Sequence, residues 1–218
     1  MSDRKNVYIV DDNGDVRRAT FRLLDALGMA PRAFASGQDF LDAQHELAPG
    51  CVLLDLRLPD MDGLDILQTA QAHLGKLQFV MMTGHGDIET AVRAMRMGAI
   101  DFLEKPFLEG MLTQTLERGF ATLAEQAAAH DAREHAEQAL LGLTNRERDV
   151  LAGLLGGMSN KRVGQWLGLS PRTVEMHRAH MMEKLAARTL SDALRTAMAG
   201  GLRPAGTDDA EAGSASVR

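Results

Sequence analysis

The chain has 218 residues, of which 45% are hydrophobic, and a formal net charge of −6. This length suits one or two domains, and the hydrophobic fraction excludes a wholly disordered chain. No apolar run reaches the roughly 18 residues of a membrane helix, and residues 1–15 lack the long apolar stretch of a secretion signal. The single cysteine, Cys51, excludes an intrachain disulfide. We therefore expect a soluble cytoplasmic protein without a membrane partner.

The charge is unevenly distributed along the chain. It is −6 over residues 1–120, −3 over 121–142, +4 over 143–202 and −1 over 203–218. Opposite signs in the two halves indicate two different tasks, and a basic C-terminal module hints at a polyanionic partner. The expected organisation is a first domain over 1–120, a linker helix over 121–142, a second domain over 143–202 and a disordered tail over 203–218.

The first half alternates between strand and helix patterns. Short apolar runs predict strands at 6–10, 30–35, 51–55, 78–83 and 100–103. Helical patterns lie between them at 16–27, 36–47, 64–74 and 87–97. Ser36 and Asp39 predict a capping box at the start of the second helix. Five strands that alternate with helices are typical of a doubly wound parallel sheet, so we expect an α/β fold.

The pattern changes after residue 107. Residues 107–141 contain no proline and favour one long helix. Its apolar face runs from Leu112 to Ala127 and then fades into alanine and charge. A solvated linker helix and a dimer-forming coiled segment are both compatible with this pattern.

Residues 143–200 predict an all-α domain of four helices. Capping signals open the helices at Thr144, Ser159, Ser170 and Thr189, and Pro171 suits the first turn of the third helix. Glu147 and Asp192 complete predicted capping boxes with Thr144 and Thr189. The glycines after residue 155 and at Gly168 end the first two helices.

Polar side chains follow four of the predicted strands. Asp11 and Asp12 come after the first strand, Asp55 ends the third, Thr83 ends the fourth and Lys105 follows the fifth. The carboxyl ends of parallel strands meet at one edge of the sheet, where ligands bind. Clustered carboxylates repel unless a cation neutralises them, and hard oxygen ligands suit Mg²⁺. An aspartate beside such an ion can attack a phosphoryl group, whose oxygens Lys105 and Thr83 are suited to bind.

Four segments carry a specific resemblance: VYIVDDN, CVLLDLRLPDMDGLD, MMTGHGD and GAIDFLEKPF. They resemble the receiver domain of bacterial two-component response regulators, from residue 6 to about 120. The resemblance implies a flavodoxin-like fold with Asp55 as phosphoacceptor. It implies Mg²⁺ held by Asp11, Asp12, Asp55 and the backbone carbonyl of Arg57. It further implies Thr83 and Phe102 as the switch residues and a cis bond between Lys105 and Pro106. Asn13 stands where an acid is common, a departure that bears on dephosphorylation or metal affinity.

The third C-terminal helix, predicted at about 171–186, has two distinct faces. At 100° per residue, Val174, His177, Met181 and Leu185 share the face that we assign to the core. The opposite face is free to enter a DNA groove and carries Arg172, Glu175, Met176, Ala179 and Glu183. Residues suited to hold phosphates are Lys161, Arg162, Thr173, Arg178, Lys184 and Arg188.

The segment 143–185 resembles the LuxR/NarL-type helix-turn-helix in its FixJ-like branch. Arg162 departs from a usual Glu, and Gly164-Gln165-Trp166 replaces a small-residue, basic run. We expect Gly164 to weaken its helix by about 1 kcal/mol relative to Ala.

Together the two resemblances imply a phosphorylation-switched transcription factor. A histidine kinase would phosphorylate Asp55, and the chain would then dimerise, bind double-stranded promoter DNA and contact RNA polymerase. The resemblance favours activation over repression. The receiver would catalyse only its own phosphoryl transfer and autodephosphorylation, so we do not expect an enzyme in the usual sense.

Three other functions compete with this one. A Mg²⁺-dependent aspartyl phosphatase also uses an acidic crevice, but it would want an acid where Arg57 stands and needs no helix-turn-helix. A phosphate-independent DNA binder with a vestigial receiver conflicts with the intact polar set at the strand ends. A small-molecule-sensing regulator would need an apolar pocket where residues 1–120 offer a phosphorylation site.

Overall fold

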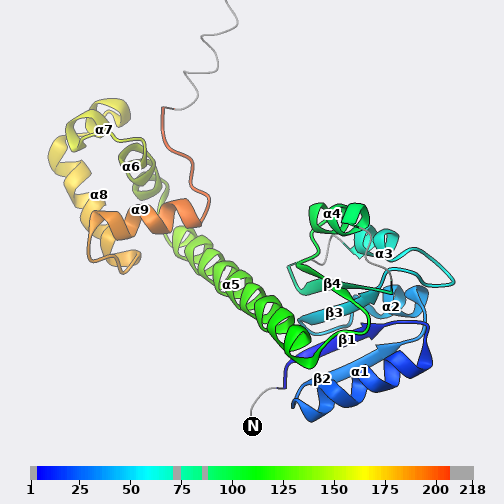
Figure 1. Cartoon of the computed structure of the whole chain (residues 1–218). Coiled ribbons are helices and arrows are strands. Elements are labelled where there is room, and N and C mark those ends of the chain that lie inside the picture. The colour runs from blue at the N-terminus through cyan, green and yellow to red at the C-terminus, as the bar shows by residue number, and fades with distance from the viewer. Residues whose placement is uncertain (1–3, 71–74, 85–87, 207–218) are drawn as a thin grey trace, which may run out of the picture. The chain divides into compact units, whose positions relative to one another are not determined.

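The computed structural model divides the chain into two compact units, residues 1–127 and 128–218 (Figure 1). It describes residues 4–70, 75–84 and 88–206. The first unit is a sheet covered by helices, and the second is helical. One helix, α5 (Glu109–Leu141), contributes to both units, so the division falls inside a helix and not in a loop.

The sheet has five parallel strands. They are β1 (Asn6–Val10), β2 (Ala30–Phe34), β3 (Gly50–Asp55), β4 (Leu77–Thr83) and β5 (Asp101–Glu104), in the order β2-β1-β3-β4-β5. This is the flavodoxin-like order, which reverses between β1 and β3. The predicted doubly wound fold is confirmed, and the carboxyl ends of β1 and β3 lie side by side.

Each face of the sheet is covered by helices (Figure 1). Val7 and Ile9 of β1 pack in one cluster with α1 (Gly14–Ala26) and the first half of α5. Tyr8 and Val10 pack on the other face with α2 (Gly37–Ala43), α3 (Gly63–Thr69) and α4 (Ile88–Arg96). Alternate strand residues thus serve opposite cores, which leaves the strand ends as the place for functional side chains.

Two predicted helices are shorter in the structure. Helix α2 ends at Ala43, because the chain turns there with the Glu46 N–H bonded to the Ala43 carbonyl at 3.0 Å. Leu47 is therefore buried outside the helix. Ser36 Oγ accepts a hydrogen bond from the Asp39 N–H, which is one half of the predicted capping box. Helix α3 ends at Thr69; residues 71–74 and 87, predicted as helical, lie outside the described residues.

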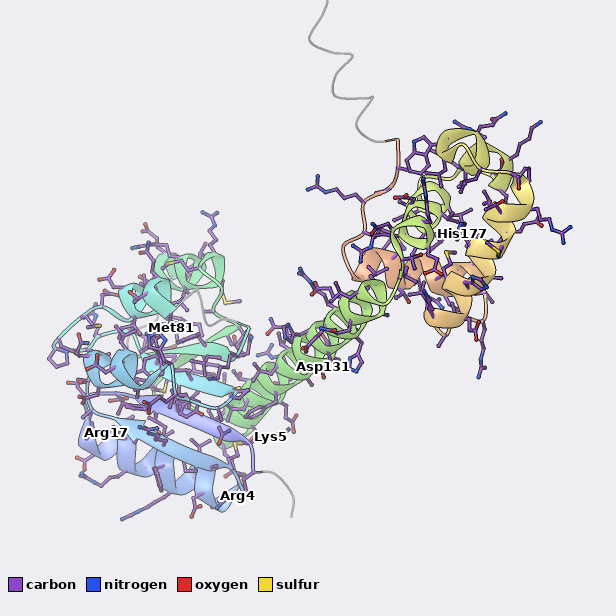
Figure 2. All side chains as sticks on the ribbon, turned by 180° about the vertical axis from the view of Figure 1, so that it is seen from behind. Arg4, Lys5, Arg17, Met81, Asp131 and His177 are labelled. Atoms are coloured by element: carbon purple, nitrogen blue, oxygen red, sulfur yellow. The ribbon has the colours of Figure 1, made fainter. Side chains whose placement is uncertain are left out.

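Helix α5 changes character along its length. Leu112, Leu116 and Leu123 are buried in the core of the first unit, whereas every residue from 124 to 135 is exposed. Asp131 lies in the middle of this exposed stretch (Figure 2). This stretch consists of alanine and polar or charged residues and lacks the large apolar side chains of the first half of the helix. Exposure in the single chain is compatible with both interpretations of the linker, the solvated helix and the dimer-forming coiled segment.

The second unit contains the four predicted helices after α5. They are α6 (Asn145–Leu155), α7 (Asn160–Leu167), α8 (Pro171–Lys184) and α9 (Leu190–Ala199). The capping boxes at Thr144 and Thr189 are both formed. Residues 203–206, predicted as part of the tail, pack back onto α6, where the Ala205 N–H bonds the Ala152 carbonyl at 2.9 Å. Residues 207–218 lie outside the described residues. Of the helices described, none is long and apolar enough to cross a membrane.

Candidate metal centre and candidate nucleic-acid interface

Three carboxylates meet at the carboxyl edge of the sheet. Asp11 and Asp12 follow β1, and Asp55 ends β3; one oxygen from each lies within 4.8 Å of the others. Asp11 and Asp55 are buried, whereas Asp12 is exposed. The sheet register thus brings together residues that are more than 40 positions apart, as the strand-end argument predicts.

Lys105 provides positive charge at this edge. Its Nζ lies 2.6 Å from Asp11 Oδ2 and 2.9 Å from Asp55 Oδ2. The bond between Lys105 and Pro106 is cis, as predicted. The Lys105 ammonium therefore faces two of the three clustered carboxylates, and the cluster keeps an excess of negative charge.

The surroundings of Asp55 shift its pKa. Burial raises the pKa of Asp55 above its ordinary value, and the nearby Asp11 raises it further, while Lys105 lowers it only in part. A divalent cation would supply the missing charge. The three carboxylates are hard oxygen donors with room for phosphate beside them, so the residues fit Mg²⁺.

An open pocket of about 250 Å³ adjoins the carboxylates. Its lining includes Thr83 from the end of β4 and Arg57 from the loop after β3. Thr83 is buried at the rim of the sheet. Phe102 of β5 is partly buried against the α2–α4 side of the core. The structure therefore brings Asp11, Asp12, Asp55, Thr83 and Lys105 together, whereas Phe102 is not among the residues that line the pocket.

Two residues near the site serve the backbone. Asn13 caps α1, because its Oδ1 accepts hydrogen bonds from the Asp15 and Val16 N–H groups. Arg17 (Figure 2) donates from Nη1 to the backbone carbonyl of Asp11 at 2.6 Å. Sequence reasoning missed Arg17, although its place one helical turn after Asn13 and close to the acids was a usable signal.

The second unit presents α8 as predicted. Val174, Met181 and Leu185 are buried in its core, and His177 (Figure 2) lies at the core edge. The residues assigned to the groove face are all exposed: Arg172, Glu175, Met176, Ala179 and Glu183. The solvent-facing side of α8 is thus free of the core.

The residues around α8 that were predicted to bind DNA differ in their contacts. Lys161, Arg162, Arg172 and Arg188 are exposed and have no ion pair among the described residues. Thr173 shares a 2.8 Å hydrogen bond with Ser170 Oγ, and Arg178 donates to Asn160 Oδ1 at 3.5 Å. Lys184 is different, because its Nζ lies 2.7 Å from Oε2 of Glu147, a buried side chain of α6.

Gly164 corrects an expectation. A Cβ at this position of α7 would lie 2.8 Å from the backbone carbonyl of Leu169. Glycine permits this close approach between α7 and the turn, so replacing it by alanine would introduce a clash rather than strengthen the helix. Trp166, two residues later, packs beside Gly153 of α6. A Cβ on Gly153 would lie 3.5 Å from the Trp166 ring.

Comparisons with known proteins agree with both units. The family described as response regulator receiver domain matches residues 7–117, and the luxR family of bacterial regulatory proteins matches residues 141–197. The transcriptional regulatory protein FixJ of Azorhizobium caulinodans is 40% identical over 210 residues, covering 96% of this chain and 99% of the relative. FixJ of Bradyrhizobium diazoefficiens is 38% identical over 202 residues, covering 93% and 98%.

Solved structures show the same organisation. Full-length FixJ from B. japonicum matches with a TM-score of 0.57 and 37% identity, covering 91% of this chain and 98% of that chain. The response regulator StyR matches with a TM-score of 0.75 and 35% identity, covering 90% and 99%. The chain therefore belongs to the FixJ-like response regulators, in which a receiver domain is joined to a LuxR-type DNA-binding domain, and it is a phosphorylation-regulated transcriptional regulator.

Proposed function

We propose that Asp55 is the phosphoacceptor and that a sensor histidine kinase is the donor. Mg²⁺ would be held by Asp11, Asp12, Asp55 and the backbone carbonyl of Arg57. The observation that carries this proposal is the position of Lys105 Nζ, 2.6 Å from Asp11 and 2.9 Å from Asp55, in a cluster that still has surplus negative charge. Such a cluster is poor as a structural brace and well suited to bind a cation together with a phosphoryl group.

The site residues have defined roles in the transfer. When bound, Mg²⁺ supplies positive charge that offsets the carboxylates and the phosphoryl oxygens. A carboxylate oxygen of Asp55 forms a bond to phosphorus, the P–N bond of the donor phosphohistidine breaks, and the imidazole leaves. Lys105 and the Thr83 hydroxyl then donate hydrogen bonds to phosphoryl oxygens. Water later hydrolyses the acyl phosphate, so the chain catalyses only reactions of its own aspartate.

Phosphorylation would change the surface of the receiver. The acyl phosphate adds between about one and two negative charges at pH 7, which draws Thr83 and Lys105 toward it. Phe102, which is partly buried against the core, would turn further inward, and the surface over residues 88–107 would repack. We infer that this change builds a homodimer interface, because a two-fold pair of reading helices spaced by about 34 Å matches one turn of DNA.

The second unit would bind double-stranded promoter DNA through α8. Its exposed face would enter the major groove with Arg172, Glu175, Met176 and Ala179. Around it, the residues proposed to hold the DNA backbone are Lys161, Arg162, Thr173, Arg178 and Arg188. Lys184 was predicted among them, but its 2.7 Å contact with buried Glu147 supports a structural role. In the cytoplasm, the DNA-bound dimer would contact RNA polymerase and activate transcription.

The proposed domain boundaries follow from these roles. The receiver would span 1–120, the linker 121–142 and the DNA-binding domain 143–202, extended by residues 203–206, which pack back onto α6. The compact units meet between residues 127 and 128, inside the proposed linker. One end of the proposed linker therefore belongs to the first compact unit and the other end to the second.

The phosphoacceptor can be tested with a small phosphoryl donor. We expect the chain with Mg²⁺ and acetyl phosphate to gain one phosphoryl group by mass spectrometry and to lose it in hydroxylamine, which cleaves acyl phosphates. Asp55→Asn should prevent the gain, whereas Asp65→Asn, on the exposed side of α3, should not. A phosphoryl group retained by Asp55→Asn would place the acceptor elsewhere.

A further inference from the structure

The loop that follows Asp55 is tied to the rest of the receiver at both ends. At its base, the Leu56 N–H bonds the Met82 carbonyl and the Gly63 N–H bonds the Leu56 carbonyl, both at 2.8 Å. Arg57 also pairs with Asp62 in an isolated antiparallel bridge. These contacts fix where the loop leaves and rejoins the sheet edge, but they do not hold its tip.

The tip of this loop is held by α2. Asp60 Oδ1 accepts a hydrogen bond from the Gly37 N–H at 3.3 Å, and Asp60 Oδ2 accepts one from the Gln38 N–H at 2.9 Å. These are the first two N–H groups of the helix, which have no partner within it. The N–H group of Gln38 lowers the pKa of Asp60 below its ordinary value, against a smaller effect of burial, and that of Gly37 lowers it further.

The neighbouring side chain reinforces this contact. Met61 lies against Gly37 so closely that a Cβ on Gly37 would approach Met61 Cγ to 2.7 Å. Gly37 is buried, and Met61 and Leu58 are partly buried against the same core cluster. The loop tip is therefore held by two independent contacts with α2, one through hydrogen bonds and one apolar.

We propose that Asp60 is a positioning residue for the acidic site, acting through the loop that carries Arg57. Asp60 lies three positions after Arg57, whose carbonyl is one of the proposed Mg²⁺ ligands. With both base and tip fixed, this carbonyl is held in place before the cation arrives, which lowers the cost of ordering it on binding. The inference rests on the proposed function, because it assigns Mg²⁺ to this edge of the sheet.

The chain offers a matched control in the same helix. Ser36 Oγ accepts the Asp39 N–H at 3.1 Å, so Ser36→Ala also removes a hydrogen bond from the start of α2. Unlike Asp60→Ala, this change leaves the contact between α2 and the loop intact. A general loosening of α2 should affect both variants alike, whereas loss of the anchor should affect only Asp60→Ala. Asp60→Asn keeps one oxygen acceptor and should fall between Asp60→Ala and the unsubstituted chain.

The first test needs no metal. Amide hydrogen exchange measured by NMR in metal-free full-length protein should become at least tenfold faster over residues 57–63 in Asp60→Ala. The same amides should keep their rates in Ser36→Ala. Unchanged exchange in Asp60→Ala would overturn the anchor, whatever the site binds.

The second test is a Mg²⁺ titration followed by backbone amide shifts. We expect the affinity to fall about five- to tenfold in Asp60→Ala, to fall less in Asp60→Asn and to stay within twofold in Ser36→Ala. An equal fall in Asp60→Ala and Ser36→Ala would overturn the positioning role in favour of simple destabilisation. If the unsubstituted chain binds no Mg²⁺ at millimolar concentration, the proposed function itself fails, and the exchange result still decides whether the anchor exists.

Discussion

Each unit of the molecule contains a lysine bonded to a buried carboxylate, and the two arrangements differ in charge balance. In the receiver, Lys105 is shared between Asp11 and Asp55, with Asp12 beside them. In the DNA-binding unit, Lys184 forms an ion pair with the single carboxylate of Glu147. Burial raises the pKa of Asp55, and Lys105, which lowers it, does not cancel this effect. Burial also acts to raise the pKa of Glu147, but Lys184 and Thr144 outweigh it and leave that pKa lowered.

The comparison shows how a brace can be told from a ligand site. Glu147 has its charge matched by Lys184 and accepts the Thr144 N–H at 2.8 Å, so its ionised form is satisfied within the fold. Asp55 lies among more acids than bases, so its ionised form requires positive charge from a bound cation. A carboxylate that the fold leaves undersupplied with positive charge is a candidate for function.

The largest expected effect comes from breaking the brace. Glu147→Ala removes the partner of Lys184 and half of a capping box, and should lower the free energy of unfolding of the DNA-binding unit by about 2–3 kcal/mol. The half-exposed position of Lys184 keeps the loss below that of a fully buried pair. Trp166, the single tryptophan of the chain, lies in this unit and reports its unfolding by fluorescence in urea.

The control for this experiment is another acid of α6. Asp149 forms a surface pair with Arg146 at 3.6 Å, and both side chains are substantially exposed. Asp149→Ala should cost less than about 0.5 kcal/mol. Equal losses for the two variants would contradict the special role of Glu147.

Lys161 and Lys184 should separate DNA contact from stability. Lys161→Ala should flatten the dependence of log K on log salt by about one phosphate's worth and leave unfolding unchanged. Lys184→Ala should lower stability by about 1–2 kcal/mol, since it leaves Glu147 buried without its cation, and should keep the salt slope. DNA titrations at several salt concentrations, with parallel urea unfolding, test both. An altered slope in Lys184→Ala would return this lysine to the DNA backbone.

The excess charge at the receiver site predicts a stabilising substitution. Because the pKa of Asp55 is raised in the folded state, its ionisation favours the unfolded chain, and stability falls as pH rises through that pKa. Asp55→Asn should therefore raise the melting temperature of the metal-free receiver at pH 7 and remove its stabilisation by Mg²⁺. Calorimetry with and without Mg²⁺ measures both effects. A lower melting temperature in Asp55→Asn would mean that the Asp55 charge stabilises the fold itself.

The smallest effect is a pH dependence of opposite sign in the other unit. The lowered pKa of Glu147 means that its ionised form stabilises the folded state above the ordinary carboxyl range. This contribution is lost as pH falls through the folded pKa. Urea unfolding followed by Trp166 should show stability decreasing below about pH 4.5, with a weaker decrease in Glu147→Gln. Identical acid profiles would assign the loss to other groups.

Sequence reasoning succeeded where the signal is local or repeats with the strand pattern. The strand ends placed Asp11, Asp55, Thr83 and Lys105 correctly at one edge, because parallel strands bring their carboxyl ends together whatever their spacing. The capping boxes at Thr144 and Thr189 were predicted because their partners lie three residues away. The faces of α8 followed from the helical period alone.

It failed where two distant segments meet. Lys184 and Glu147 are 37 residues apart, and on one helix face Lys184 has the same appearance as any phosphate-binding lysine. Asp60 and Gln38 are 22 residues apart, and neither segment has a sequence pattern that predicts their contact. The benefit of Gly164 depends on the Leu169 carbonyl, which approaches only after the turn has folded. Such contacts require the tertiary structure.

Charge added at Asp55 should control DNA binding by the other unit. The most direct test measures the affinity of the full chain for its promoter DNA with Mg²⁺ alone and with Mg²⁺ plus beryllofluoride, a phosphoryl analogue, while sedimentation follows the oligomeric state. The account predicts a dimer and at least tenfold tighter binding with beryllofluoride, and neither change in Asp55→Asn. Equal affinity and an unchanged sedimentation coefficient in the unsubstituted chain would contradict it.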